Sequence, residues 1–428
     1  MDTTALQDHA ERSLALMRAA GFEHAQVSAN VTRLNELNVA HNEPSLLRST
    51  ESHKLSLLGL VDGRKASTDL SDLSEDSVRR RVASLFDDAR SAPEDEANAV
   101  SSGQHTRLVQ GPQQAEPALL ADKLAELLAF RAGETPKMMI EEALAAHTLA
   151  QSHTLTSGGS DLACSLGWYS ISVMGTARDG KSTSSFNFTS GSSNELRDRP
   201  AAEYFGIADM LRDTQQQVRT EALGGSFVGD VVLTPPAVAD LMEWLQEQIG
   251  DVQLIAGSSL YRERVGTGIA SPLLSLRSRF DAPGVAAISA DGFVTPPVDL
   301  VRDGRLCTLT PSLYGSRKTG LPHVPLASAG WEVPAGQAPL GELVSAVARG
   351  ALVGRLSMGN PASNGDFSGV IKNSFRIADG TVGAALSEVM ITGNIARMLQ
   401  DVAAVSRGRI DTGSWLLPWL RVTGLHFS

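Results

Sequence analysis

The sequence is poor in cysteine, in long apolar runs and in excess positive charge. Its 428 residues include only 2 cysteines, Cys164 and Cys307, so it has neither a disulfide framework nor a cysteine-based zinc spacing. No apolar run approaches the roughly 18 residues of a membrane-spanning helix, and the first residues contain no apolar signal segment. The net charge of −11 and the lack of a basic run argue against nucleic acid or an anionic membrane as the main partner. We therefore expect a cytoplasmic protein.

Common hydrolase motifs are also missing. None of the 9 histidines belongs to an H-E-x-x-H pattern, and the nearest pairs, His147 with His153 and His41 with His53, lack helical zinc spacing. The nucleophile pattern G-x-S-x-G does not occur. We expect the histidines to be surface or hydrogen-bonded structural residues, and both cysteines to be small buried apolar residues.

One nucleotide-binding pattern is present in full. Residues 175–182 satisfy the P-loop expression G-x-x-x-x-G-K-[ST]. Phosphate binding requires such a loop to lead into a helix, yet the following "KSTSSFNFTS" alternates like a strand. The pattern therefore predicts a hairpin turn at Arg178–Lys181, with ATP binding as the alternative.

The remaining composition is that of a soluble globular protein, with 42% hydrophobic and 20% charged residues. Its length predicts two or three domains. We expect an α+β fold with an N-terminal α/β domain over residues 1–92, a linker or long loop over 93–116, a middle helix and strand region over 117–228, and a C-terminal domain of mostly antiparallel sheet with packed helices over 229–428.

Local patterns place the individual elements. Periodicity predicts helices that begin near Thr4, Glu75, Pro117 and Pro235, and two more over residues 340–348 and 386–405. Asp-Gly pairs at 62–63, 291–292, 303–304 and 379–380 predict tight hairpin turns, since both residues tolerate positive φ.

The segment "NPASNGDFSGVIKNSFRIADG", residues 360–380, combines a polar glycine-containing loop with an alternating strand. Asp366, Ser368 and Lys372 are residues that acid–base or nucleophilic sites use. A structural turn followed by a strand is the favoured interpretation, because Asn364-Gly365 is a turn signal. Peptide contact and catalysis are the alternatives.

This segment also carries a family resemblance. Together with the "GW.V..G" entry before it and "SE.MI.GN" after it, the block "R.S.G.P..NGDFSGV.KNSF.I.DG" closely resembles the TldD/PmbA family, in particular its TldE (PmbA) branch. Upstream segments such as "VVLTPPAVADL", "GTGIASPLLSL" and "VDGRKASTDLSDLS" fit the same family in order. The resemblance covers most of the chain and is strongest from about Gly229 onward.

The resemblance implies a cytosolic metallopeptidase system of two subunit types. The TldD type carries zinc on an H-E-x-x-x-H helix and a later cysteine, while the TldE type lacks these ligands and helps enclose the peptide-binding chamber. The corresponding helix here is "AVADLMEWLQEQ", with Glu243, Trp244 and Gln248 near the motif positions. Indole and carboxamide groups cannot build a nitrogen-rich, three-ligand zinc site. No metal, cofactor or catalytic residue is therefore expected in this chain, and zinc is expected in a TldD-like partner.

The leading hypothesis is thus a zinc-free TldE-like subunit that joins a TldD-like protein to process or degrade unfolded or flexible peptides. A peptide could bind by strand addition, which depends on main-chain hydrogen bonds. A homodimeric peptide-binding protein without peptidase activity and an independent peptidase with an unrecognised site are the alternatives. The candidate peptide-binding residues are Asn364, Asp366, Phe367, Ser368, Lys372 and Asn373.

Overall fold

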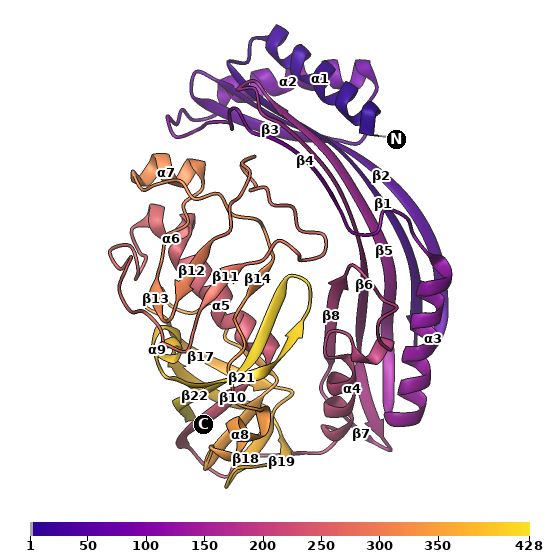
Figure 1. Cartoon of the computed structure of the whole chain (residues 1–428), viewed down its shortest axis with the longest axis vertical. Coiled ribbons are helices and arrows are strands. Elements are labelled where there is room, and N and C mark those ends of the chain that lie inside the picture. Colours follow the sequence, from indigo (N-terminus) through magenta and orange to yellow (C-terminus); the bar gives the residue numbers. More distant parts are fainter. Residues whose placement is uncertain (1–2) are drawn as a thin grey trace.

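The computed structural model describes residues 3–428 and consists of two lobes, each built around one large sheet (Figure 1). The sheet of the N-terminal lobe is long and curved. Its strands are β1 (His24–Ala40), β2 (Glu43–Val61), β3 (Arg64–Leu70), β4 (His105–Gln110), β5 (Met138–Thr156), β6 (Asp161–Asp179), β7 (Ser182–Thr183) and β8 (Asn187–Ser193). The strand order is β3-β2-β1-β5-β6-β4, with β7 and β8 also paired to β6. All these pairs are antiparallel except β4 with β6.

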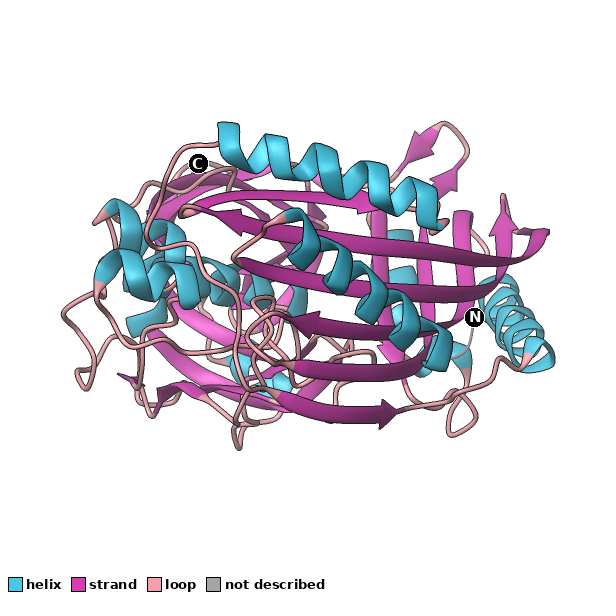
Figure 2. Ribbon diagram, turned by 90° about the horizontal axis from the view of Figure 1, so that it is seen from above, coloured by secondary structure: helices cyan, strands magenta, loops and turns pink. Residues whose placement is uncertain are grey.

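Helices cover only the convex face of this sheet. They are α1 (Thr3–Ala20), α2 (Glu75–Ser91), α3 (Pro117–Glu134), the short 3₁₀ helix η1 (Ala201–Glu203) and α4 (Ile207–Gln216). Val27 and Val31 on β1 are buried beneath α1 and α2, whereas the alternate residues Ser28 and Asn30 point to the opposite, concave face. In the view from above, two helices lie over the strands and run along or obliquely to them (Figure 2). The concave face is turned toward the C-terminal lobe (Figure 1).

This sheet differs from the predicted division of the chain. Residues 1–92 and 117–228, expected as separate regions, contribute strands to the same sheet, because β1 pairs with both β2 and β5. The expected linker over residues 93–116 contains β4, which pairs with β6. Sequence-local patterns could not reveal these pairings, since β1 and β5 are about one hundred residues apart in the chain.

The predicted tight turns are confirmed at three Asp-Gly pairs. Both residues have positive φ at 62–63, 303–304 and 379–380, and each pair joins two neighbouring antiparallel strands. The P-loop-like segment is also a hairpin turn: Asp179 pairs with Ser182 across Gly180, whose φ is +61°. The segment leads from one strand to another, so it lacks the helix that phosphate binding requires.

The C-terminal lobe contains the second sheet and a further five helices within residues 3–428. Its strands are β9 (Thr220–Glu221), β10 (Phe227–Leu233), β11 (Leu276–Ser278), β12 (Asp299–Arg302), β13 (Arg305–Leu306), β14 (Trp331–Glu332), β15 (Arg349–Val353), β16 (Arg355–Ser357), β17 (Asp366–Lys372), β18 (Phe375–Ala378), β19 (Thr381–Leu386), β20 (Val389–Asn394), β21 (Val402–Asp411) and β22 (Trp415–Phe427). The helices are α5 (Pro235–Ile249), α6 (Asp251–Ala256), α7 (Leu313–Thr319), α8 (Leu340–Ser345) and α9 (Ile395–Gln400).

Alternation along β10 assigns these helices to the two faces of the second sheet. Val231 and Leu233 belong to the main core with α5 and α9, while Val232 packs with Leu343 of α8 on the other face. The overall class is therefore α+β with mainly antiparallel sheets, as predicted. None of the helices in residues 3–428 combines the length and apolarity needed to cross a bilayer.

One predicted helix is wrong. Residues 386–405 form the end of β19, then β20, the short α9 and the start of β21 rather than one helix. Val389 and Ile391, two positions apart, are both buried, and both pair with residues of β17. The apolar pattern of this segment is therefore that of a strand and not that of a helix. The helix begins only at Ile395, after the capping residue Asn394, whose Oδ1 accepts a hydrogen bond from the N–H of Arg397 at 3.0 Å.

The lobes touch at both ends of the concave face. At one end, Asp95 accepts hydrogen bonds from Tyr314 Oη and Lys318 Nζ of α7, both at 2.8 Å. The bond from Lys318, the largest influence, helps lower the pKa of Asp95 to about 2. At the other end, Asn373 Nδ2 donates to Gln217 Oε1 at 3.0 Å. These contacts hold the second lobe over the concave face.

Candidate functional site

Helix α5 is the element in which the resemblance would put a zinc motif. The helix begins after Thr234, with prolines at its first two positions, and its apolar stripe packs on the second sheet. Glu243 is exposed, whereas Trp244 and Gln248 are buried, with 5% and 1% of their surface exposed. The three side chains therefore do not converge on one open space.

Both buried side chains have structural partners. The Trp244 ring stands edge-on to Tyr261, with the ring centroids 6.2 Å apart. Gln248 Oε1 accepts a hydrogen bond from the backbone N–H of Leu260 at 3.2 Å. Each residue thus fixes the segment that follows α6 against helix α5.

Trp244 also joins α5 to the turn before β17. Gly365 in this turn has a φ of +89°, and a Cβ atom there would lie 3.1 Å from Trp244 Cζ2. Only glycine satisfies both the positive φ and the close approach without strain. The tertiary structure therefore brings two sequence-predicted candidates, the zinc-position helix and the 360–380 block, into direct contact.

Asp366 holds this turn together. Its carboxylate accepts hydrogen bonds from the Nδ2 groups of Asn394 and Asn364, both at 2.8 Å. The backbone N–H of Asp366 donates to Asn364 Oδ1 at 3.1 Å. The hydrogen bond from Asn394, followed by that from Asn364, lowers the pKa of Asp366, so the carboxylate stays ionised. This geometry suits a structural turn rather than a general base that works near neutral pH.

The other candidates in the block lie in different places. Phe367 is buried in the core beneath α5 and α9, while Ser368 and Lys372 are exposed on the opposite face of β17. Asn373, with a φ of 51°, is buried at the contact with Gln217 of the other lobe. The six residues therefore do not line one cleft, because alternation along β17 splits them between two faces.

Asp240 of α5 and Arg355 of β16 are half-buried, oppositely charged neighbours that were not among the sequence-predicted candidates. Burial raises the pKa of Asp240 to about 7, and the negative charge of Glu243 adds to the effect, although a hydrogen bond from the Leu356 N–H opposes it. Arg355 lies close enough to stabilise the charged form of Asp240. Burial lowers the pKa of Arg355 to about 10. In the sequence, the only sign of this pair was that Asp240, a polar residue, occupies a half-buried position of the predicted helix.

Arg355 also connects the two lobes. Its guanidinium stacks on the ring of Phe188, 3.3 Å from the ring centroid, and its Nε donates to Asn187 Oδ1 at 3.3 Å. It also donates to the carbonyl oxygen of Phe188. The position of α5 is therefore coupled through Arg355 to β8 of the N-terminal sheet.

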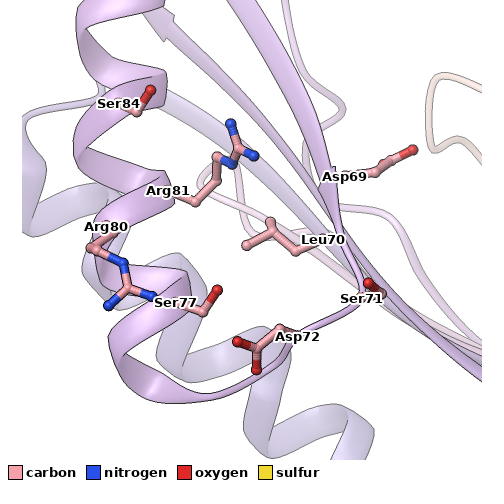
Figure 3. Close-up of a pocket in the computed structure, with 8 residues that line it drawn as sticks. All are labelled: Asp69, Leu70, Ser71, Asp72, Ser77, Arg80, Arg81 and Ser84. Atoms are coloured by element: carbon pink, nitrogen blue, oxygen red, sulfur yellow. The ribbon is translucent and has the colours of Figure 1, made fainter.

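Two surface depressions adjoin the edge strand β3. One, of about 450 Å³, lies on the convex side where α2 passes the end of β3, and its lining includes Arg80 and Arg81 of the helix and Leu70 and Asp72 at the end of β3 (Figure 3). The other, of about 410 Å³, opens on the concave face between β1, β2 and β3. Neither depression includes a residue of the 360–380 block or of α5.

Residues 226–428 match the family described as the PmbA/TldA metallopeptidase C-terminal domain. The C-terminal part of the chain, residues 226–428, is therefore a domain of the TldD/PmbA family. No curated protein sequence matches it.

Solved structures share the fold of this chain over nearly its whole length. A protein from Bacteroides thetaiotaomicron described as a modulator of DNA gyrase has 21% identity and a TM-score of 0.84, with all of both chains covered. TldE from Thermococcus kodakarensis has 18% identity and a TM-score of 0.82, covering 98% of this chain and 100% of the other. A protein from Thermotoga maritima, also described as a DNA gyrase modulator, has 15% identity and a TM-score of 0.78, covering 99% and 100%. At these identities the likeness shows a common fold.

The family name raises the question of whether α5 could hold zinc. Trp244 has no lone pair to donate, and the carboxamide of Gln248 is already bonded to the backbone. Within residues 3–428, no three side chains of His, Cys, Asp or Glu gather as metal ligands. The donor set at these positions of α5 therefore does not fit zinc.

Two histidines are hydrogen-bonded structural residues, as predicted. The prediction that both cysteines are buried is wrong for one of them. His147 Nε2 bonds to the carbonyl oxygen of Pro112 at 2.8 Å, and His153 Nε2 bonds to Asp161 at the same distance. Cys164 is buried, as predicted, but Cys307 is exposed. Strand β13 ends at the buried Leu306, so the next residue points away from the core.

Proposed function

We propose that this chain is the zinc-free, TldE-type subunit of a TldD/TldE-type metallopeptidase and works in the cytoplasm. In this proposal it binds a TldD-like protein and forms part of the chamber that receives unfolded or flexible peptides. Catalytic zinc belongs to the partner. The family match and the likeness in fold to TldE from Thermococcus kodakarensis support the assignment.

The main support for the proposal is the structural role of the side chains on α5. At the positions where the family resemblance expects zinc ligands and a general base, Trp244 packs on Tyr261 and Gln248 bonds to Leu260. These side chains support the fold, so the helix serves as a scaffold rather than as a metal centre. A subunit of this kind needs a zinc-bearing partner for peptide cleavage.

The test is reconstitution with a TldD-like protein encoded in the same genome. The two full-length chains are purified separately and together, and cleavage of a flexible, unstructured peptide is measured for each protein and for the mixture. We expect a stable complex whose cleavage exceeds that of either protein alone and stops when zinc is chelated. The absence of both complex formation and added proteolysis, with such a partner present, would contradict the proposal.

The same preparation separates the alternatives. A homodimer that binds peptide without cleaving it, in a genome that lacks a TldD-like gene, would favour a peptide-binding protein. Cleavage by the pure chain, together with bound metal in elemental analysis, would favour an independent peptidase. Cleavage by the pure chain is not expected, because Glu243, Trp244 and Gln248 do not converge as metal ligands.

A further inference from the structure

The concave face of the N-terminal sheet carries an unusual concentration of hydroxyl groups. In cross-strand register, Ser28 lies between Ser56 and Thr154, and Ser170 and Ser172 lie opposite Ser192 and Ser190. We call the following set the hydroxyl face: Ser28, Thr32, Ser52, Ser56, Thr148, Ser152, Thr154, Ser170, Ser172, Ser190 and Ser192. All of them occupy the same side of β1, β2, β5, β6 and β8, because successive residues of a strand alternate between faces.

This face is close to electrically neutral although the chain has a net charge of −11. Its members carry no charge. The charged residues beside them on β2 are paired, Arg48 with Glu36 at 2.5 Å and Lys54 with Asp69 at 3.2 Å. A strongly charged ligand therefore finds no complementary field here.

Several of these hydroxyls are free to bind a ligand. Ser28 and Thr154 bond to each other at 2.7 Å, and Ser56 donates to Asp69 at 2.6 Å. By contrast, the half-buried hydroxyls of Thr32 and Thr148 make no hydrogen bond to any other residue in the described range 3–428. A hydroxyl both donates and accepts, so each can bond to either a backbone N–H or a backbone C=O.

The C-terminal lobe covers part of this face. Gln110 Nε2 of β4 donates to the carbonyl oxygen of Phe280 at 3.1 Å. Gly284 approaches Trp168 so closely that a Cβ atom there would lie 2.9 Å from the indole ring. The depression of about 410 Å³ beside Ser28 and Ser56 opens on the same concave face. The hydroxyl face therefore lies beneath the second lobe, which also contacts its end at Ser192 through the backbone of Thr412 and Gly413.

We propose that the hydroxyl face binds an extended, uncharged stretch of polypeptide through hydrogen bonds to its backbone. Residues on one face of a strand recur every 6–7 Å or so, which is also about the two-residue repeat of an extended peptide. A peptide lying along β5 would therefore meet the hydroxyls of Thr148, Ser152 and Thr154 at multiples of its own repeat, with Ala150 between the first two. The amphoteric hydroxyls select a flexible backbone without selecting its side chains.

This inference rests on the proposed function, since it identifies where the subunit would hold a peptide. It differs from strand addition, because the peptide lies across the face of the sheet and not along an edge. Binding across the hydroxyl face also explains why this face carries little net charge, whereas strand addition would not require an uncharged face.

The test measures binding of a fluorescein-labelled, uncharged peptide of about 20 residues, made of Gly, Ala, Ser and Gln, to the full chain by fluorescence anisotropy. The double variant Thr32→Val with Thr148→Val removes two free hydroxyls and keeps the β-branched shape that strands favour. We expect the Kd to rise roughly 2- to 12-fold for each hydroxyl removed. Ser170→Ala with Ser172→Ala provides a second variant at the other end of the face.

Thr381→Val is the matched control, because Thr381 is an exposed strand residue of the other lobe. An unchanged Kd in both double variants, or an equal rise in the control, would overturn this inference but leave the proposed subunit role intact. If the wild-type chain does not bind the peptide at all, both the inference and the peptide-binding part of the proposed function fail. Concentration-dependent dimerisation that the variants abolish, without peptide binding, would mean that a second copy occupies the face and would also overturn it.

Discussion

Asp240 gives this protein a stability that should depend on pH in a predictable direction. Its pKa is raised from 3.8 to about 7, mainly by the burial of its side chain on α5. Between these two values the folded chain holds a proton that the unfolded chain has lost. The free energy of unfolding therefore falls as the pH rises through this window, because the folded state must either keep the proton or bury a charge.

Asp240→Asn removes this dependence while keeping an oxygen that can accept the hydrogen bond from Leu356. With pKa values of 3.8 and about 7, the difference in unfolding free energy between variant and wild type should grow by about 2–3 kcal/mol from pH 5 to pH 8. The variant should be the more stable protein at pH 8. Urea unfolding at the two pH values measures the difference directly.

Glu247→Gln is the matched control, since it removes an exposed carboxylate from the same helix. If the control reproduces the effect, the cause is the net charge of α5 rather than the burial of Asp240. A difference between Asp240→Asn and wild type that is the same at pH 5 and pH 8 would refute the reasoning.

Three further outcomes follow from the same structure. Gly365→Ala should destabilise the second lobe by about 1–3 kcal/mol in urea unfolding, because its φ is +89° and Trp244 is close, whereas Gly359→Ala, which also has positive φ but open space around it, should cost less. Asp95→Asn should speed hydrogen exchange in α7 without unfolding either lobe. Lowering the pH of the wild type from above 3.8 toward 2 should weaken the same contact, measured as a loss of protection in α7 relative to the intrinsic exchange rate at each pH, since the contribution of Asp95 is fully present above pH 3.8 and is lost as the pH falls toward its lowered pKa of about 2. Asp366→Ala should loosen the turn before β17 in hydrogen exchange yet leave complex formation intact; loss of the complex would give this carboxylate a role in the interface.

Local chemistry made part of this fold predictable. Asp-Gly pairs marked three hairpin turns, since both residues tolerate positive φ. The period of the apolar residues correctly marked α5. The same reasoning failed at residues 386–405, where short apolar runs fit both a strand and a helix and the pairing of β20 with β17 decided between them.

The candidate site was harder to predict. The 360–380 block carries the family resemblance, but its residues do not form one binding site. Phe367 packs in the core, Asp366 stabilises a turn by hydrogen bonds and Asn373 contacts the other lobe. Nothing in the sequence revealed the Asp240–Arg355 pair, because a pKa shift of this kind depends on burial and on a neighbour more than one hundred positions away.

The sequence by itself determined the family resemblance, the chemistry missing from α5 and the local turns, because these depend on residue identity and short spacing. Only the tertiary structure decided that Trp244 meets Gly365, that two predicted regions share one sheet, and that hydroxyls from five strands form one neutral concave face. Side-chain alternation places a residue on one face of a strand or the other. Long-range strand pairing then decides which residues from distant segments share that face, and no local pattern contains that information.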